Sequence, residues 1–195
     1  YPGVFSTKPL TVLQLLWINL VMDTLAALAF GLEPPRPETM LMKPRPRKEP
    51  FLTPTMLVNV LVLGGFFSIL VLALQATDLL GAAQYGPAVA ASAIFTSYVF
   101  LQVFNMFNAR STRPGCSALK GISKSRSFFY VMGLVVVVQV LLTEFGSNFM
   151  QTAPLPLAVW GRILLFAASG IVVGEAVRIV QRAGMKGASM VPQCA

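Results

Sequence analysis

The stretch LTVLQLLWINLVMDTLAALAFGL, from Leu10 to Leu32, decides the fold class. A bilayer core of about 30 Å is crossed by roughly 20 predominantly apolar residues in a helix, and this stretch is long enough. Four further stretches qualify, at about residues 56–77, 88–107, 128–145 and 157–180. The alternating pattern of a membrane barrel is absent, so the spans are expected to be helices. The sequence predicts an all-α fold, a polytopic membrane helix bundle with five transmembrane helices.

The composition excludes a water-soluble globule. Of the 195 residues, 55% are hydrophobic and only 11% are charged, whereas soluble domains carry about 25% charged residues. The high hydrophobicity also excludes a disordered chain. There is no His, and Cys116 and Cys194 lie far apart, which excludes a disulfide framework and a Cys-rich metal site. Because the sequence begins at Tyr1 rather than Met, we expect a piece of a longer protein.

The distribution of basic residues predicts the orientation in the membrane. The formal net charge is +8, and Lys and Arg residues gather in the cytosolic loops of membrane proteins. They cluster here in loops at about 33–54 and 109–126 and again after residue 180, whereas the connections at 78–87 and 146–156 contain none. The N-terminus is therefore expected outside and the C-terminus in the cytosol. Since topology accounts for the positive charge, no nucleic-acid partner is expected.

Asn19 and Asp23 are polar residues in the middle of the first span. A carboxylate within a span costs at least about 2.5 kcal/mol to insert, which makes Asp23 a functional candidate. Asn19 lies four residues earlier, on the same face of an α-helix. Carboxylate and amide oxygens suit a hard cation such as Ca²⁺, which takes about six to eight oxygen ligands, so this pair would supply only part of a site. The alternative is that both residues form hydrogen bonds between packed helices.

Two motifs resemble the calcium-transporting P-type ATPases. The run LWINLVMD (16–23), followed by EPP (33–35), looks like the sixth membrane helix of that family, and QVFNMFNAR (102–110) resembles the end of its eighth helix. The motifs occur in the family's order and separation, so the resemblance covers essentially the whole chain, as helices six to ten. It implies the membrane-embedded ion-transport half of an ATP-driven calcium pump. Ca²⁺ would be the transported ion, with Asn19 and Asp23 as direct ligands.

Two departures from the motif point to one branch of that family. By resemblance, Met22 stands where two-site pumps have a Thr that helps to bind a second ion, and Gln102 stands where they have a Glu. Met22 offers no oxygen, and Gln102 carries no charge. Both features are similar to the plasma-membrane and plant autoinhibited branch, which moves one calcium ion per cycle. The resemblance therefore implies a single calcium site, with Gln102 as a secondary polar contributor, in the plasma membrane or a vacuolar or other endomembrane.

The resemblance also implies which parts of such a pump lie outside this sequence. The phosphorylated Asp motif, the nucleotide-binding domain that uses ATP and Mg²⁺, the actuator loop and the first five helices are not found in it. The chain would be inactive alone, with no catalytic residue of its own and with the rest of the pump and the lipid bilayer as partners. Calmodulin regulates part of that branch, but Gly184 and Gly187 argue against a calmodulin-binding helix here. The alternatives are a non-enzymatic five-helix scaffold or regulator of a transporter, and part of a secondary cation transporter.

Charged and aromatic residues elsewhere in the spans have simpler interpretations. Glu144 is expected to be an interfacial anchor near the outer end of its span. Glu175 and Arg178 are spaced for an ion pair within one helix. Trp17 is expected to pack within the bundle and Trp160 to join an aromatic belt at the membrane surface.

Overall fold

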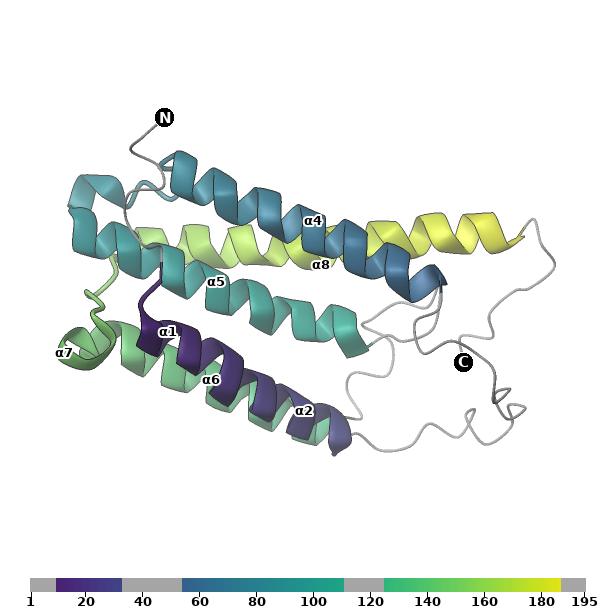
Figure 1. The fold of residues 1–195 in the computed structure, drawn as a ribbon, viewed down its shortest axis with the longest axis horizontal. Coiled ribbons are helices and arrows are strands. Elements are labelled where there is room, and N and C mark those ends of the chain that lie inside the picture. The colour runs from purple at the N-terminus through teal and green to yellow at the C-terminus, as the bar shows by residue number, and fades with distance from the viewer. Residues whose placement is uncertain (1–9, 33–53, 111–124, 187–195) are drawn as a thin grey trace.

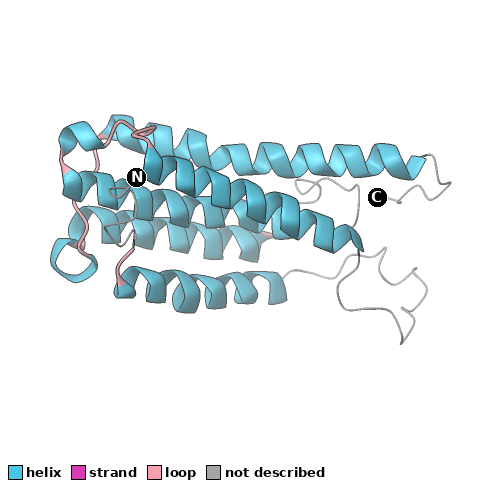
Figure 2. Cartoon of the chain, turned by 45° about the horizontal axis from the view of Figure 1, so that its top comes forward, coloured by secondary structure: helices cyan, strands magenta, loops and turns pink. Residues whose placement is uncertain are grey.

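The computed structural model describes residues 10–32, 54–110 and 125–186, and every regular element in these ranges is helical (Figure 2). The first span is continuous but changes its winding, because α1 (Val12–Leu16) leads into the π-helical segment η1 (Trp17–Met22) and then into α2 (Asp23–Gly31). The elements that follow are α4 (Pro54–Ala76), the 3₁₀ turn η2 (Ala83–Tyr85), α5 (Pro87–Arg110), α6 (Arg126–Phe145), the short α7 (Ser147–Met150) and α8 (Leu157–Lys186).

Five helices in the described ranges are long and apolar enough to cross a membrane. They are the first span, α4, α5, α6 and α8, so the predicted all-α bundle of five membrane helices is confirmed. Large apolar side chains cover the outside of the bundle. Leu61, Ile69 and Leu165, for example, are 64%, 69% and 77% exposed. Such a surface would be unfavourable in water and is suited to lipid. The protein is a multi-pass membrane protein.

The helix starts follow from local sequence. Thr11 and Gln14 form a capping box, in which the Gln14 N–H donates to the Thr11 hydroxyl and the Thr11 N–H donates to the Gln14 side-chain oxygen. Pro54 and Pro87 occupy the first positions of α4 and α5, where a missing N–H costs nothing. In the connection before η2, the Asp78 carboxylate accepts hydrogen bonds from the N–H groups of the turn. These local signals define the ends of the spans.

Helix α5 lies at the centre of the bundle (Figure 1). It contacts α4 and α8 on one side and α6 on the other, and the first span packs against α6. Two apolar clusters form the core, and α5 contributes to both. One joins the first span, α5 and α6 through residues such as Trp17, Phe95 and Phe128. The other joins α4, α5 and α8 through residues such as Phe100 and Ile163.

The connections from α4 to α5 and from α6 to α8 lie at the same end of the bundle as the start of α1 (Figure 1). The predicted cytosolic loops at 33–54 and 109–126 fall almost entirely outside the described residues, as do Cys116 and Cys194. The orientation, with the N-terminus outside and the C-terminus in the cytosol, therefore stays a prediction from charge.

Candidate functional site

The polar pair of the first span lies where the helix changes its winding. Asn19 is in the π-helical segment η1, and Asp23 is the first residue of α2. Both side chains are exposed, whereas Trp17, Ile18 and Met22 on the same segment are buried in the core. Single π-turns inside α-helices are rare and occur frequently at functional sites. The segment thus presents an amide and a carboxylate on a surface that the described helices of this chain leave open.

The sequence analysis assumed a regular α-helix around Asn19 and Asp23, and the structure corrects this geometry. Periodicity could not reveal the change, because four residues make close to one turn in either winding. The π-segment affects Trp17 and Met22 more. They are five residues apart, which in an α-helix would separate them by about 140° around the axis. In η1 both face the core, at 9% and 4% exposure.

Neighbouring polar side chains of the first span do not join this pair. Gln14 is buried, and its side-chain nitrogen donates to the Met150 carbonyl at 2.9 Å, which ties α1 to α7. The Thr24 hydroxyl donates to the Leu20 carbonyl within the same helix. In the part of the chain that the structure describes, no group of three or more His, Cys, Asp or Glu residues is placed to hold a metal ion. A cation bound by Asn19 and Asp23 would therefore need further ligands from elsewhere.

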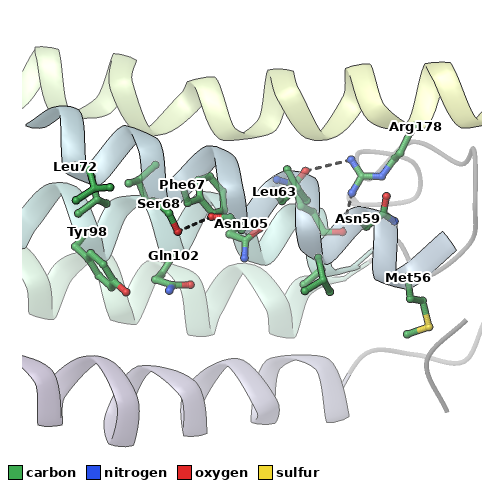
Figure 3. Close-up of a pocket in the computed structure, with 16 residues that line it drawn as sticks. Met56, Asn59, Leu63, Phe67, Ser68, Leu72, Tyr98, Gln102, Asn105 and Arg178 are labelled. Atoms are coloured by element: carbon green, nitrogen blue, oxygen red, sulfur yellow. Dashed lines mark hydrogen bonds between the residues drawn. The ribbon is translucent and has the colours of Figure 1, made fainter. Parts of the chain in front are cut away.

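Gln102 lies apart from this pair, on α5. Together with Asn105 it lines a cavity of about 760 Å³ between α4 and α5, with Arg178 at one end (Figure 3). Asn59, Ser68 and other residues of α4 form the facing wall. The described residues that line this cavity include neither Asn19 nor Asp23, and none of them is a carboxylate. The structure thus does not bring Gln102 together with the proposed calcium ligands.

The ion pair between Glu175 and Arg178 is confirmed, with 3.3 Å between Arg178 Nη1 and Glu175 Oε1. The structure adds a partner that the sequence analysis missed. Arg178 also donates to the Asn108 side-chain oxygen at 3.1 Å and to the Asn108 carbonyl at 2.7 Å. Asn108 in turn donates to the Gly170 carbonyl at 2.9 Å. This buried junction fastens the end of α5 to α8. In the sequence, its signal was that Asn108 is one of four polar residues within the QVFNMFNAR run.

The structure gives Glu144 hydrogen-bond partners that the sequence analysis did not predict. Its Oε1 atom accepts hydrogen bonds from the Trp160 indole at 3.0 Å and from the Leu155 N–H at 3.3 Å, and the side chain is half-buried. Glu144 therefore joins the end of α6 to α8 and to the connection before it. Trp160 also packs edge-on against Phe100, with 5.8 Å between the ring centroids.

A second buried polar network was also missed. The Trp17 indole donates to the Gln139 side-chain oxygen at 3.0 Å, and Gln139 is itself bonded to Thr143. Trp17 packs within the bundle, as the sequence analysis expected. Gln139 interrupts the apolar run VVVVQVLL (135–142), and such a lone amide in an apolar span was the available signal.

The fold defines a multi-pass membrane protein that has an exposed amide and an exposed carboxylate on its first span. The chain belongs to the family of cation-transporting ATPases, because the family model described as "Cation transporting ATPase, C-terminus" matches residues 7–180. The resemblance stated from the two motifs is thereby confirmed.

Individual relatives are named as calcium-transporting ATPases. The putative calcium-transporting ATPase 13, plasma membrane-type, of Arabidopsis thaliana is 38% identical over 175 residues, which cover 88% of this chain and 17% of that protein. The plasma membrane-type calcium-transporting ATPase 4 of the same plant is 35% identical over 187 residues, 91% of this chain and 17% of that protein. The plasma membrane calcium-transporting ATPase mca-1 of Caenorhabditis elegans is 32% identical over 184 residues, 90% and 15% respectively. The chain thus spans about one-sixth of the length of these relatives.

Proposed function

We propose that this chain is the membrane-embedded ion-transport part of an ATP-driven calcium pump, and that Asn19 and Asp23 supply part of a single calcium-binding site. The observation that carries the proposal is the exposed placement of both side chains on a membrane span, in and directly after a π-helical segment whose residues Trp17, Ile18 and Met22 are buried. The calcium-transporting ATPases among the relatives support calcium as the ion.

The chemistry of the pair fits a hard divalent cation. Asp23 contributes a carboxylate, which compensates part of the ion's charge, and Asn19 contributes a neutral carbonyl oxygen. An ionised carboxylate exposed to hydrocarbon would be unfavourable, so this face is best explained by a protein surface and a cation beside it. The remaining ligands would come from the rest of the pump, which would also contain the ATP- and Mg²⁺-dependent machinery.

Two features support one ion rather than two. Met22 carries only a thioether, a poor ligand for calcium, and its side chain is turned into the core at 4% exposure. Gln102 offers a neutral amide in a cavity whose described lining has no carboxylate. A second divalent ion there would lack compensating charge, and burying an uncompensated charge in a low-dielectric bundle is very costly.

The test is Asp23→Asn in the full-length pump, which removes the charge and keeps the size of the side chain. We expect this variant to lose calcium-dependent phosphorylation from ATP and to retain phosphorylation from inorganic phosphate, which needs no bound calcium. Glu144→Gln is the matched control. It makes the same chemical change in another span and keeps an oxygen that accepts from Trp160, so calcium-dependent phosphorylation should persist. A phosphoenzyme of near-normal calcium affinity in Asp23→Asn would contradict the assignment.

A further inference from the structure

A buried hydrogen-bond network of polar side chains connects the start of η1 to α6 and α5. Trp17 donates to Gln139 Oε1 at 3.0 Å, Gln139 Nε2 lies 3.1 Å from the Thr143 hydroxyl, and the Thr143 and Thr96 hydroxyls are 3.1 Å apart. Gln139, Thr143 and Thr96 are all fully buried. This network therefore joins three membrane helices through contacts that lipid and water do not reach.

The hydrogen-bond donors and acceptors in this network have one consistent arrangement. The indole N–H of Trp17 is a donor only, so it requires the oxygen of the Gln139 amide. The Thr143 hydroxyl donates to the Gln139 backbone carbonyl at 2.8 Å, so its oxygen accepts from Gln139 Nε2. Thr96 must then be the donor to Thr143. Because each group has one defined role, Gln139 presents its oxygen to Trp17 in a fixed direction.

This bond acts at the point where the π-segment begins. Trp17 is the first residue of η1, and Asn19 follows two residues later. On the preceding turn, Gln14 is bonded to the Met150 carbonyl, while on the far side Met22 is held by apolar packing. Successive residues of an α-helix are about 100° apart around its axis. If η1 relaxed to an α-helix, the shift in register would therefore rotate the side chains on one side of η1 relative to those on the other side. The bond to Trp17 opposes that rotation in addition to the apolar packing, because it requires one direction of the indole N–H.

We propose that Gln139 is a positioning residue for the ion-binding face of the first span. Its side-chain oxygen holds the Trp17 indole, and this bond fixes the rotation of η1 that turns Asn19 and Asp23 away from the core. The inference rests on the proposed function, because it assumes that these two residues bind the ion. Gln139 itself is buried inside the bundle and touches no ion; it acts through Trp17.

The test uses the full-length pump with Gln139→Met, Trp17→Phe and the double variant. Met keeps a similar volume without the amide oxygen, and Phe keeps an aromatic ring without the indole N–H. We measure the calcium concentration that gives half-maximal phosphorylation from ATP, the maximal phosphoenzyme level, and phosphorylation from inorganic phosphate. A neutral hydrogen bond contributes about 0.5–1.5 kcal/mol, so each single variant should need about two- to tenfold more calcium. The maximal level and the reaction with inorganic phosphate should be unchanged.

Asn108→Ala is the matched control for a purely structural effect. It breaks another buried polar network, between α5 and α8, which has no bond to the first span. This variant should lower thermal stability and leave the half-maximal calcium concentration unchanged. A loss of calcium affinity equal to that of Gln139→Met would show a general packing effect and overturn the proposal.

The double variant tests whether the two residues act through one bond. If they do, it should need no more calcium than the weaker-binding single variant, whereas additive losses would overturn the proposal. Unchanged calcium affinity in both single variants would also overturn it. Should Gln139→Met give no phosphoenzyme from inorganic phosphate and hence be misfolded, Trp17→Phe decides by the same criterion.

Asp23→Asn in the same series separates the proposed function from the positioning role of Gln139. If Asp23→Asn retains calcium-dependent phosphorylation, the proposed function fails. If Asp23→Asn loses it while Gln139→Met and Trp17→Phe both keep the wild-type calcium affinity, the positioning role alone fails.

Discussion

Gly174→Ala should weaken the junction between α5 and α8. A Cβ atom at Gly174 would lie 2.1 Å from the Asn108 side-chain oxygen and 2.6 Å from its amide carbon. Asn108 cannot easily move aside, because it donates to the Gly170 carbonyl at 2.9 Å and accepts from Arg178 at 3.1 Å. Its side chain is 4% exposed and borders the cavity between α4 and α5, so a displaced amide would have to leave both partners and move toward that cavity. The added methyl group must therefore expel the Asn108 amide from its site.

The magnitude follows from the bonds that would be lost. A neutral hydrogen bond contributes about 1 kcal/mol and one to a charged group about 2 kcal/mol. Replacing Gly by Ala within a helix returns about 1 kcal/mol of propensity. The free energy of unfolding should thus fall by about 2 kcal/mol. The bond from Arg178 to the Asn108 backbone carbonyl is expected to survive, because the side chain does not make it.

The assay is equilibrium unfolding of the purified full-length protein in mixed micelles, with Gly133→Ala as the matched control. Gly133 also lies inside a membrane helix, and a Cβ atom there would meet nothing within 4 Å. The control should be neutral or slightly stabilising. In an Asn108→Ala background, Gly174→Ala should cost little, because the clashing amide is gone. Equal effects of Gly174→Ala and Gly133→Ala in the wild-type background would refute the reasoning.

Three further predictions concern stoichiometry, topology and the hydrogen bonds of Glu144. Calcium activation of phosphorylation in the full-length pump should show a Hill coefficient near one, because Met22 and Gln102 do not provide for a second ion; a value near two would contradict this. With Cys194 replaced, an impermeant thiol reagent should label Cys116 only from the cytosolic side, and labelling of intact cells would overturn the predicted orientation. Glu144→Leu should lower the free energy of unfolding by about 2 kcal/mol, since it leaves the Trp160 and Leu155 N–H groups without their acceptor. Glu144→Gln should cost clearly less in the same unfolding assay, and equal losses would refute the role of that oxygen.

The fold class could be predicted from the sequence because the length of apolar runs alone specifies membrane spans. The ion pair of Glu175 and Arg178 was equally accessible, since residues three apart on a helix are neighbours. Periodicity did not predict the π-segment, because Asn19 and Asp23 share a face in either winding. The sequence could show that the pair is polar and mid-span, but not that Trp17 and Met22 both turn inward.

The missed contacts have a common physical cause. The hydrogen bond between Trp17 and Gln139 joins residues that are 122 positions apart in the sequence, and the one between Arg178 and Asn108 joins residues that are 70 positions apart. Each is a polar group within an apolar helix that must find a partner on another helix. A sequence reveals that such a partner is needed. Which helix provides it depends on how the helices pack.

Equilibrium binding of ⁴⁵Ca to the purified full-length pump tests the central claim most directly, comparing the wild type with Asp23→Asn. The account predicts one calcium ion bound per phosphorylatable site in the wild type. It predicts no binding at the same calcium concentration in the variant, because the carboxylate beside the π-segment is gone. Two ions bound by the wild type would contradict the single site, and unchanged binding by Asp23→Asn would contradict the role of Asp23 as a ligand.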